Sequence, residues 1–167
     1  MHKCLQGIKL VSFLLLFTIT NINAEQKYND AAALNGIEQA KGVFLIDFKT
    51  AKTTAFYMDL IVGTYDGFKR QGVEPEIVVV VIGPTVQFLS KEAKPELAFE
   101  YEESFDSIQQ SIKALAARNV RIEICAIATD VFNVDNDKLP QELDVVADGF
   151  ISLIGWQTQG YKLVPVF

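Results

Sequence analysis

Short runs of apolar residues alternate with longer segments of helical spacing along most of this chain. The runs that predict strands are 43–48, 76–82, 120–127, 144–147 and 162–167. The second of them (EIVVVVI) is the clearest, because it is continuous, short and rich in β-branched residues. Runs of this kind are typical of strands that a parallel sheet buries on both faces. Pro165 lacks the amide proton of a ladder hydrogen bond, so the last strand is expected at an edge or at its own end.

Helical spacing fills the intervals between these runs. The predicted helices are 30–40, 53–70, 86–90, 96–118 and 149–159. In the longest of them, Phe105, Ile108, Ile112 and Leu115 recur at intervals of three and four residues, and Asn119 follows as a left-handed cap. Strands that alternate with helices predict an α/β protein. We expect a three-layer α/β/α fold around a mostly parallel sheet of about five strands.

The carboxyl ends of parallel strands meet at one edge of a sheet, where open α/β proteins bind ligands. Four loops are expected there, and their reactive and polar side chains include those of Lys49, Lys52, Thr85, Cys125, Thr129 and Asp148. These residues are the candidates for a functional site, with Cys125 as the catalytic group and the other five as pocket residues.

The first 24 residues have the pattern of an export signal. Lys3 and Lys9 precede or begin an apolar run over 10–19, and Ala24 is a small residue at the expected cleavage point. A membrane-spanning helix needs about 20 apolar residues, which is longer than this run. We therefore predict cleavage after Ala24 and no stable membrane insertion; an uncleaved anchor is the alternative. Residues 25–167 then form one domain that is periplasmic or secreted.

Charge narrows the classes of partner. The 167 residues carry 15 basic and 21 acidic side chains. Without Lys3 and Lys9, 13 basic residues remain against the same 21 acidic ones, so the net charge is −8. This charge argues against nucleic acid or an anionic membrane as a partner.

Removal of the leader also removes the only histidine, His2, and one of the two cysteines, Cys4. The remaining thiol, Cys125, has no histidine to act with it, which excludes Ser-His-Asp triads, Cys-His pairs and zinc sites within one chain. Residues 135–137 (DND) lack the glycine and glutamate of a calcium loop, and 83–85 (GPT) lacks the Gly-Lys-Ser/Thr of a phosphate loop. No metal and no cofactor are predicted.

The surroundings of Cys125 give opposing indications of reactivity. A helix that begins directly after it would favour the thiolate through its dipole. Strand alternation places Glu123 on the same face, where a carboxylate disfavours the thiolate. Lys49 or Lys52, from a neighbouring loop, would reverse that effect. Free cysteine is also among the most buried residue types, so a functional sulfur site and an inert core cysteine both remain open.

Several segments resemble the DsrE/DsrF-like family of sulfur-relay proteins. Residues 119–130 (NVRIEICAIATD) resemble its cysteine segment, and the preceding helix (IQQSIKAL, 108–115) is similar too. The strand that ends in Val81-Ile-Gly-Pro84 and the closing stretch 149–165 (GFISLIGWQTQGYKLVP) complete the resemblance. It covers most of the chain and depends on the order and spacing of these segments.

This resemblance implies a five-stranded parallel sheet between helices and a homo-oligomer, either a trimer or a hexamer. It also implies that Cys125 carries a persulfide, which would require a sulfur donor and a sulfur acceptor protein. Some members lack the cysteine and serve as structural partners, so enzyme activity stays open. The relay members are cytoplasmic, whereas this chain is expected to be exported. The alternative function is a non-catalytic oligomeric binding module whose cysteine is buried.

Overall fold

Five parallel strands form the centre of the structure. The computed structural model describes residues 28–92 and 94–166. The strands are β1 (Gln39–Ile46), β2 (Glu74–Val81), β3 (Arg121–Cys125), β4 (Leu143–Val146) and β5 (Lys162–Val166). They pair in the order β4-β3-β2-β1-β5, with every pair parallel.

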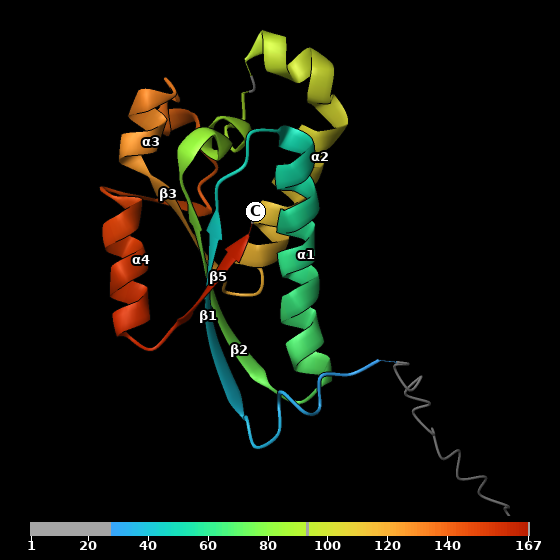
Figure 1. Ribbon diagram of the computed structural model, residues 1–167. Helices are drawn as coiled ribbons and strands as arrows, with labels where there is room; N and C mark the ends of the chain where they lie inside the picture. Colours follow the sequence, from blue (N-terminus) through green and yellow to red (C-terminus); the bar gives the residue numbers. More distant parts are fainter. Residues whose placement is uncertain (1–27, 93, 167) are drawn as a thin grey trace, which may run out of the picture.

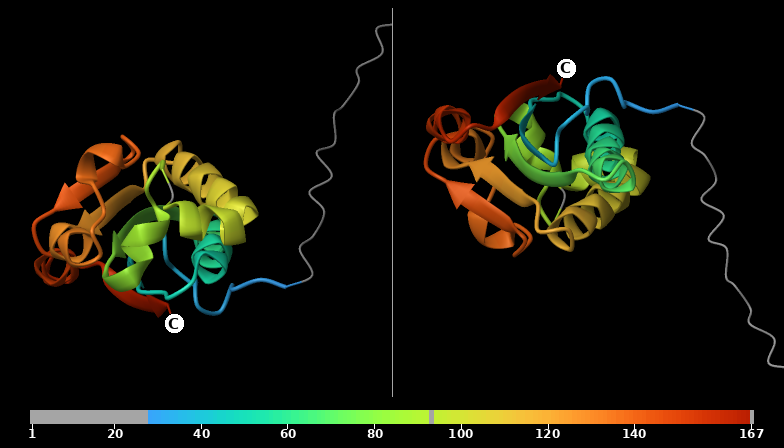
Figure 2. Two further views of the ribbon diagram at one scale, coloured as in Figure 1. Left: turned by 90° about the horizontal axis from the view of Figure 1, so that it is seen from above. Right: turned by 90° about the horizontal axis from the view of Figure 1, so that it is seen from below.

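Helices cover both faces of this sheet. The helices are α1 (Ala51–Arg70), α2 (Pro95–Ala116), α3 (Ala126–Val131) and α4 (Gly149–Thr158), with 3-10 helices η1 (Gly83–Phe88) and η2 (Asn136–Lys138). Figures 1 and 2 show α1 and α2 side by side on one face and α4 on the other, while α3 and η1 lie beyond the carboxyl ends of the strands. The three-layer α/β/α fold with a parallel sheet is therefore confirmed.

The two faces bury different amounts of apolar surface. The main core lies between the sheet and α1 and α2, where residues such as Ile46, Met58, Ile108 and Ile122 are fully buried. The opposite face has a small core of four buried residues, Val43, Val78, Val80 and Leu153. Of these, only Leu153 comes from α4, so this helix is attached to the sheet by little apolar burial.

Capping and strand position follow the local chemistry of the sequence. The Thr50 side chain accepts a hydrogen bond from the Thr53 amide and caps α1. Asn119 takes the predicted left-handed conformation, with φ of 58°. Pro165 lies in β5 at an edge of the sheet, opposite Leu45, as its missing donor predicts.

The predicted helix over 30–40 is wrong. The structure has turns from Ala31 to Gly36, and β1 already begins at Gln39. Gly36 has φ of 72°, a left-handed conformation that interrupts a helix. The alanine-rich run before it is too short to propagate a stable helix by itself.

The expected export signal, residues 1–24, lies outside the described residues. Among the helices of the described part, none combines the length and the apolar character needed to cross a membrane.

Candidate functional site

Cys125 is the last residue of β3 and immediately precedes α3. Its neighbour across the sheet is Val146, the last residue of β4. The side chain is 6% exposed. Its Sγ accepts a hydrogen bond from the amide of Gly149, at a distance of 3.3 Å. The thiol therefore lies between the ends of two strands and is held by the first residue of α4.

The first turn of α4 approaches this sulfur without an intervening side chain. Asp148 caps the helix, and its carboxylate accepts a hydrogen bond of 2.8 Å from the Phe150 amide. A Cβ at Gly149 would lie 2.6 Å from Cγ2 of Ile82 and 3.2 Å from Cβ of Cys125. Glycine is therefore needed for the close approach. The first amide of α4 donates to the sulfur in the position where helix N-termini commonly bind acceptors.

A cavity of about 270 Å³ opens beside Cys125. Its lining residues come from all four strand ends that the sequence places at this edge, and they are Asp47, Ile82, Gly83, Cys125, Ile127, Ala128, Val131, Phe132, Asp148 and Phe150. The space is sufficient for a few heavy atoms next to the sulfur. A larger hollow of about 620 Å³ lies elsewhere, between residues such as Leu34 and Phe68, and no thiol lines it.

Of the predicted pocket residues, Asp148 lines the cavity beside Cys125. Lys49 and Lys52 are exposed, in the loop after β1 and the first turn of α1, and neither lines the cavity. The Thr85 hydroxyl is buried and is bound to both the amide and the carbonyl of Phe48. The buried Thr129 hydroxyl donates to the Ala126 carbonyl within α3. Both threonines thus hold the backbone next to the cavity and do not line it.

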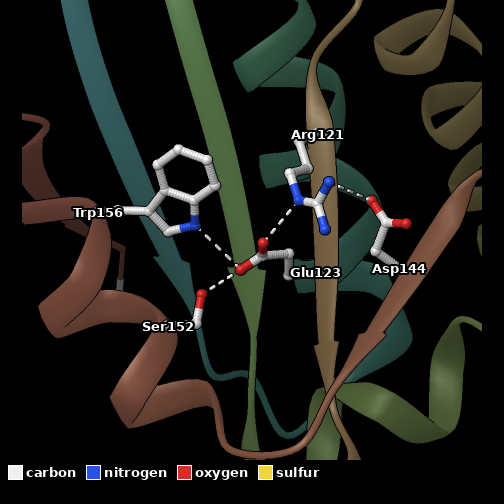
Figure 3. Close-up of polar contacts among 5 residues, drawn as sticks. All are labelled: Arg121, Glu123, Asp144, Ser152 and Trp156. Carbon is white, nitrogen blue, oxygen red and sulfur yellow. Dashed lines mark hydrogen bonds and ion pairs between the residues drawn. The ribbon is translucent and has the colours of Figure 1, made fainter. Parts of the chain in front are cut away.

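Glu123 is a buried carboxylate two residues before Cys125 in β3, on the face that α4 covers. One oxygen is 2.6 Å from Nε of Arg121, and the other accepts hydrogen bonds from Ser152 and from Nε1 of Trp156, the latter at 3.1 Å. Figure 3 shows these side chains converging on the carboxylate, with Arg121 also paired to Asp144. The bond to Glu123 raises the pKa of the Arg121 guanidinium above its ordinary value, so the guanidinium stays charged. This carboxylate therefore attaches α4 to β3.

Sequence reasoning missed three contributors to this site: Asp47, Gly149 and the partners of Glu123. The Asp148-Gly149 pair before an apolar helix is a capping signal that locates the start of α4. It does not reveal that the glycine contacts a sulfur from another strand. Within the described residues, no group of three or more His, Cys, Asp or Glu side chains is arranged to hold a metal ion.

Apolar side chains are exposed on α4 and α3, and Phe150, Ile127 and Val131 among them line the cavity. On α4 these are Phe150, Ile151 and Ile154, which we call the α4 apolar surface. Ile127 and Val131 extend it onto α3. Ile151 is 69% exposed, and it lies beside two other exposed apolar side chains on the same helix. A contiguous apolar patch of this kind is more informative than a single exposed aliphatic residue.

Solved structures share this architecture. A protein of unknown function from Methanobacterium thermoautotrophicum has a TM-score of 0.60 and 18% sequence identity, over 76% of this chain and 99% of that one. The ychN protein from E. coli has a TM-score of 0.57 and 16% identity, again over 76% of this chain and 99% of the other. At these identities, the likeness shows the fold.

Comparison of the sequence with family models identifies a family, which the comparison of folds does not. None of the curated proteins matches this chain. The sequence model of the DsrE/DsrF-like family matches residues 41–166, a range that begins in β1 and includes β5 and Cys125. The chain belongs to the DsrE/DsrF-like family.

Proposed function

We propose that this chain is an exported sulfur-handling protein in which Cys125 carries sulfane sulfur as a persulfide. The observation that carries the proposal is the position of one atom. Sγ of Cys125 accepts the Gly149 amide at 3.3 Å and belongs to a residue that lines a 270 Å³ cavity. Membership of a family known for sulfur relay supports the same function.

The chemistry is a thiol exchange that needs no oxidant or reductant. The Cys125 thiolate attacks the outer sulfur of a donor persulfide, R–S–SH. A new S–S bond forms to Cys125, the S–S bond of the donor breaks, and RS⁻ leaves with the electron pair and later takes up a proton. An acceptor thiolate then attacks the outer sulfur on Cys125 in the same manner, which regenerates the Cys125 thiolate. The Gly149 amide holds the inner sulfur during both steps.

Export and self-association belong to the same proposal. The leader pattern over residues 1–24 supports a mature protein that begins at Glu25 and acts in the periplasm or outside the cell. The α4 apolar surface supports a homo-oligomer, a trimer or a hexamer, because solvent-exposed apolar helices are usually covered by a partner. Donor and acceptor proteins reach the thiol at the mouth of the cavity.

Mass spectrometry of protein expressed from its full-length sequence tests the sulfur-carrier function. After incubation with an alkyl persulfide, we expect the mass of one added sulfur atom, mapped to Cys125, and its removal by a small acceptor thiol. Cys125→Ser should show no adduct while it keeps the same circular dichroism spectrum. A wild-type thiol that takes up no sulfur and reacts with thiol reagents only in denaturant would contradict the proposal.

The alternative is a non-catalytic oligomeric binding module with a structural cysteine. The 6% exposure of Cys125 and its contacts with the main core favour this alternative. The same measurement separates the two functions, since a structural cysteine takes up no sulfur in the folded state.

A further inference from the structure

The cavity beside Cys125 is negatively charged at its rim. Two carboxylates line it, Asp47 after β1 and Asp148 at the start of α4. Of the described residues that line it, none is lysine or arginine. A group that reaches the sulfur must therefore pass two acidic side chains without a compensating cation in the wall.

The fold fixes the Asp148 carboxylate and places the exposed Asp47 carboxylate beside Gly83. The Asp148 side chain is fixed as the cap of α4 by its 2.8 Å bond to the Phe150 amide. The Asp47 carboxylate lies directly over Gly83, where an added Cβ would overlap it. Gly83 has φ of 58°, a conformation that favours glycine, and its missing side chain leaves room for the Asp47 carboxylate.

The rest of the wall adds no acidic or basic side chain among the described lining residues. It is made mainly of apolar side chains, among them Ile82, Ile127, Val131 and Phe150. Because these side chains are uncharged, no other described side chain in the wall compensates the two carboxylates.

Basic residues near this edge lie outside the cavity. Lys49 and Lys52 are exposed and do not line it. Lys94 donates a 3.2 Å hydrogen bond to the carbonyl of Phe132, a lining residue, but its side chain lines a separate hollow with Glu92. The charged side chains that an incoming ligand meets in the cavity wall are therefore the two aspartates, while the Gly149 amide contacts the sulfur itself.

We propose that Asp47 and Asp148 select the sulfur donor by charge: the cavity accepts organic persulfides whose group next to the sulfur is uncharged or basic, and it rejects oxyanion donors such as thiosulfate. This inference rests on the proposed function, because it concerns the donor that loads Cys125. The transferred atom and the bonds formed and broken are those of the exchange above, with RS⁻ as the leaving group.

Two disulfide probes of opposite character test the selection on the full-length-expressed protein. Dithiodipyridine is uncharged and dithiobis(nitrobenzoate) is a dianion, and each reports its reaction by absorbance. For each thiol, the rate constant with the neutral probe is divided by the rate constant with the anionic probe. We expect this ratio to be about ten-fold or more higher for Cys125 than for an uncharged small thiol. Added salt should reduce this excess, because it screens the carboxylates.

The double variant Asp47→Asn, Asp148→Asn should bring the ratio close to that of the small thiol by raising the anionic rate alone. Asparagine keeps the capping oxygen at position 148, so α4 retains its start. The matched control is Asp59→Asn, Asp106→Asn, which removes two exposed charges from α1 and α2 on the opposite face and should leave the ratio high.

Three results would overturn the inference. They are a wild-type ratio equal to that of the small thiol, a ratio that the cavity variant changes no more than the control does, and sulfur loading from thiosulfate as fast as from an uncharged alkyl persulfide. In each of these cases Cys125 still reacts, so the proposed function survives. Reaction of Cys125 with neither probe and with no donor would overturn the proposed function together with the inference.

Discussion

The contact between Cys125 and Gly149 defines the site at the scale of single residues. The amide of Gly149 donates to the sulfur, and the missing side chain of this glycine allows the approach. Any larger residue would meet both Ile82 and Cys125. The identity of residue 149 is therefore determined by its contacts with Ile82 and Cys125 and not by the needs of a helix start.

Gly149→Ala tests this interpretation. The added methyl group should destabilise the protein by about 1–3 kcal/mol through overpacking. It should also change the rate at which Cys125 reacts with an uncharged disulfide. Gly155→Ala is the matched control, because it lies in the same helix and has no neighbour within 4 Å of the added Cβ. It should stabilise the protein by about 0.5–1 kcal/mol or leave it unchanged.

Urea unfolding measures both variants, with thiol kinetics on the folded proteins. Equal stability of the two alanine variants would show that α4 moves away from the sulfur at little cost.

The sequence placed Cys125 and Asp148 at the correct edge of the sheet because strand ends follow from the topology. It did not predict which neighbouring side chains line the cavity. Thr85 points into the backbone of Phe48, and Asp47 lies over Gly83. These orientations depend on contacts between loops that are far apart in sequence, and the spacing of apolar residues along the chain does not predict such contacts.

At the scale of elements, α4 is attached to the sheet mainly through polar contacts. Among the described residues of α4, Leu153 is the one buried apolar side chain that packs on the sheet. Ser152 and Trp156 of the same helix both donate to Glu123. The same helix places Gly149 beside the thiol. Glu123 thus positions the sulfur's hydrogen-bond donor although it does not touch the sulfur.

Glu123→Ala should destabilise the protein by about 1–3 kcal/mol, because the Ser152 and Trp156 donors lose their acceptor. Arg121 is nearly half exposed and keeps Asp144, so its charge is not left buried. Cys125 should react faster with an uncharged disulfide as α4 loosens, and Glu123→Gln should restore part of both properties.

Asp144→Ala serves as the control, since it removes the exposed partner of Arg121. It should cost about 0–1 kcal/mol and leave thiol reactivity unchanged. Unfolding curves and thiol kinetics that do not distinguish Glu123→Ala from Asp144→Ala would contradict the positioning role.

The elements themselves were largely predictable, and the exceptions have local causes. Apolar runs identified all five strands because a parallel sheet buries them on both faces. The helix expected over 30–40 fails at Gly36, where the chain turns left-handed. The partners of Glu123 were beyond reach because Ser152 and Trp156 lie 29 and 33 residues later and on a helix.

At the scale of the whole molecule, the two faces of the sheet are unequally covered. Two long helices pack on one face, and the short α4 covers part of the other (Figure 1). The α4 apolar surface faces outward on the thinly covered side. Association through this surface would bury it and bring a second copy of the chain next to the mouth of the cavity.

The double variant Ile151→Ser, Ile154→Ser tests this association. Light scattering should give the mass of a trimer or a hexamer for the wild-type protein and a lower mass for the variant. Both side chains are exposed, so the fold should persist in circular dichroism. The control Leu60→Ser removes an exposed apolar side chain from α1 and should keep the wild-type mass. A monomeric wild-type protein, or a variant of unchanged mass, would contradict this prediction.

The position of β5 next to β1 has a consequence for the order in which the molecule folds. Gly42 in β1 pairs with Lys162 in β5. One edge of β1 therefore stays unpaired until β5, near the end of the chain, has been synthesised. Such distant pairing slows folding and leaves the edge of β1 unsatisfied until then. For a chain proposed to cross a membrane through a narrow secretion channel, slow folding is an advantage, because an unfolded polypeptide can be threaded through such a channel.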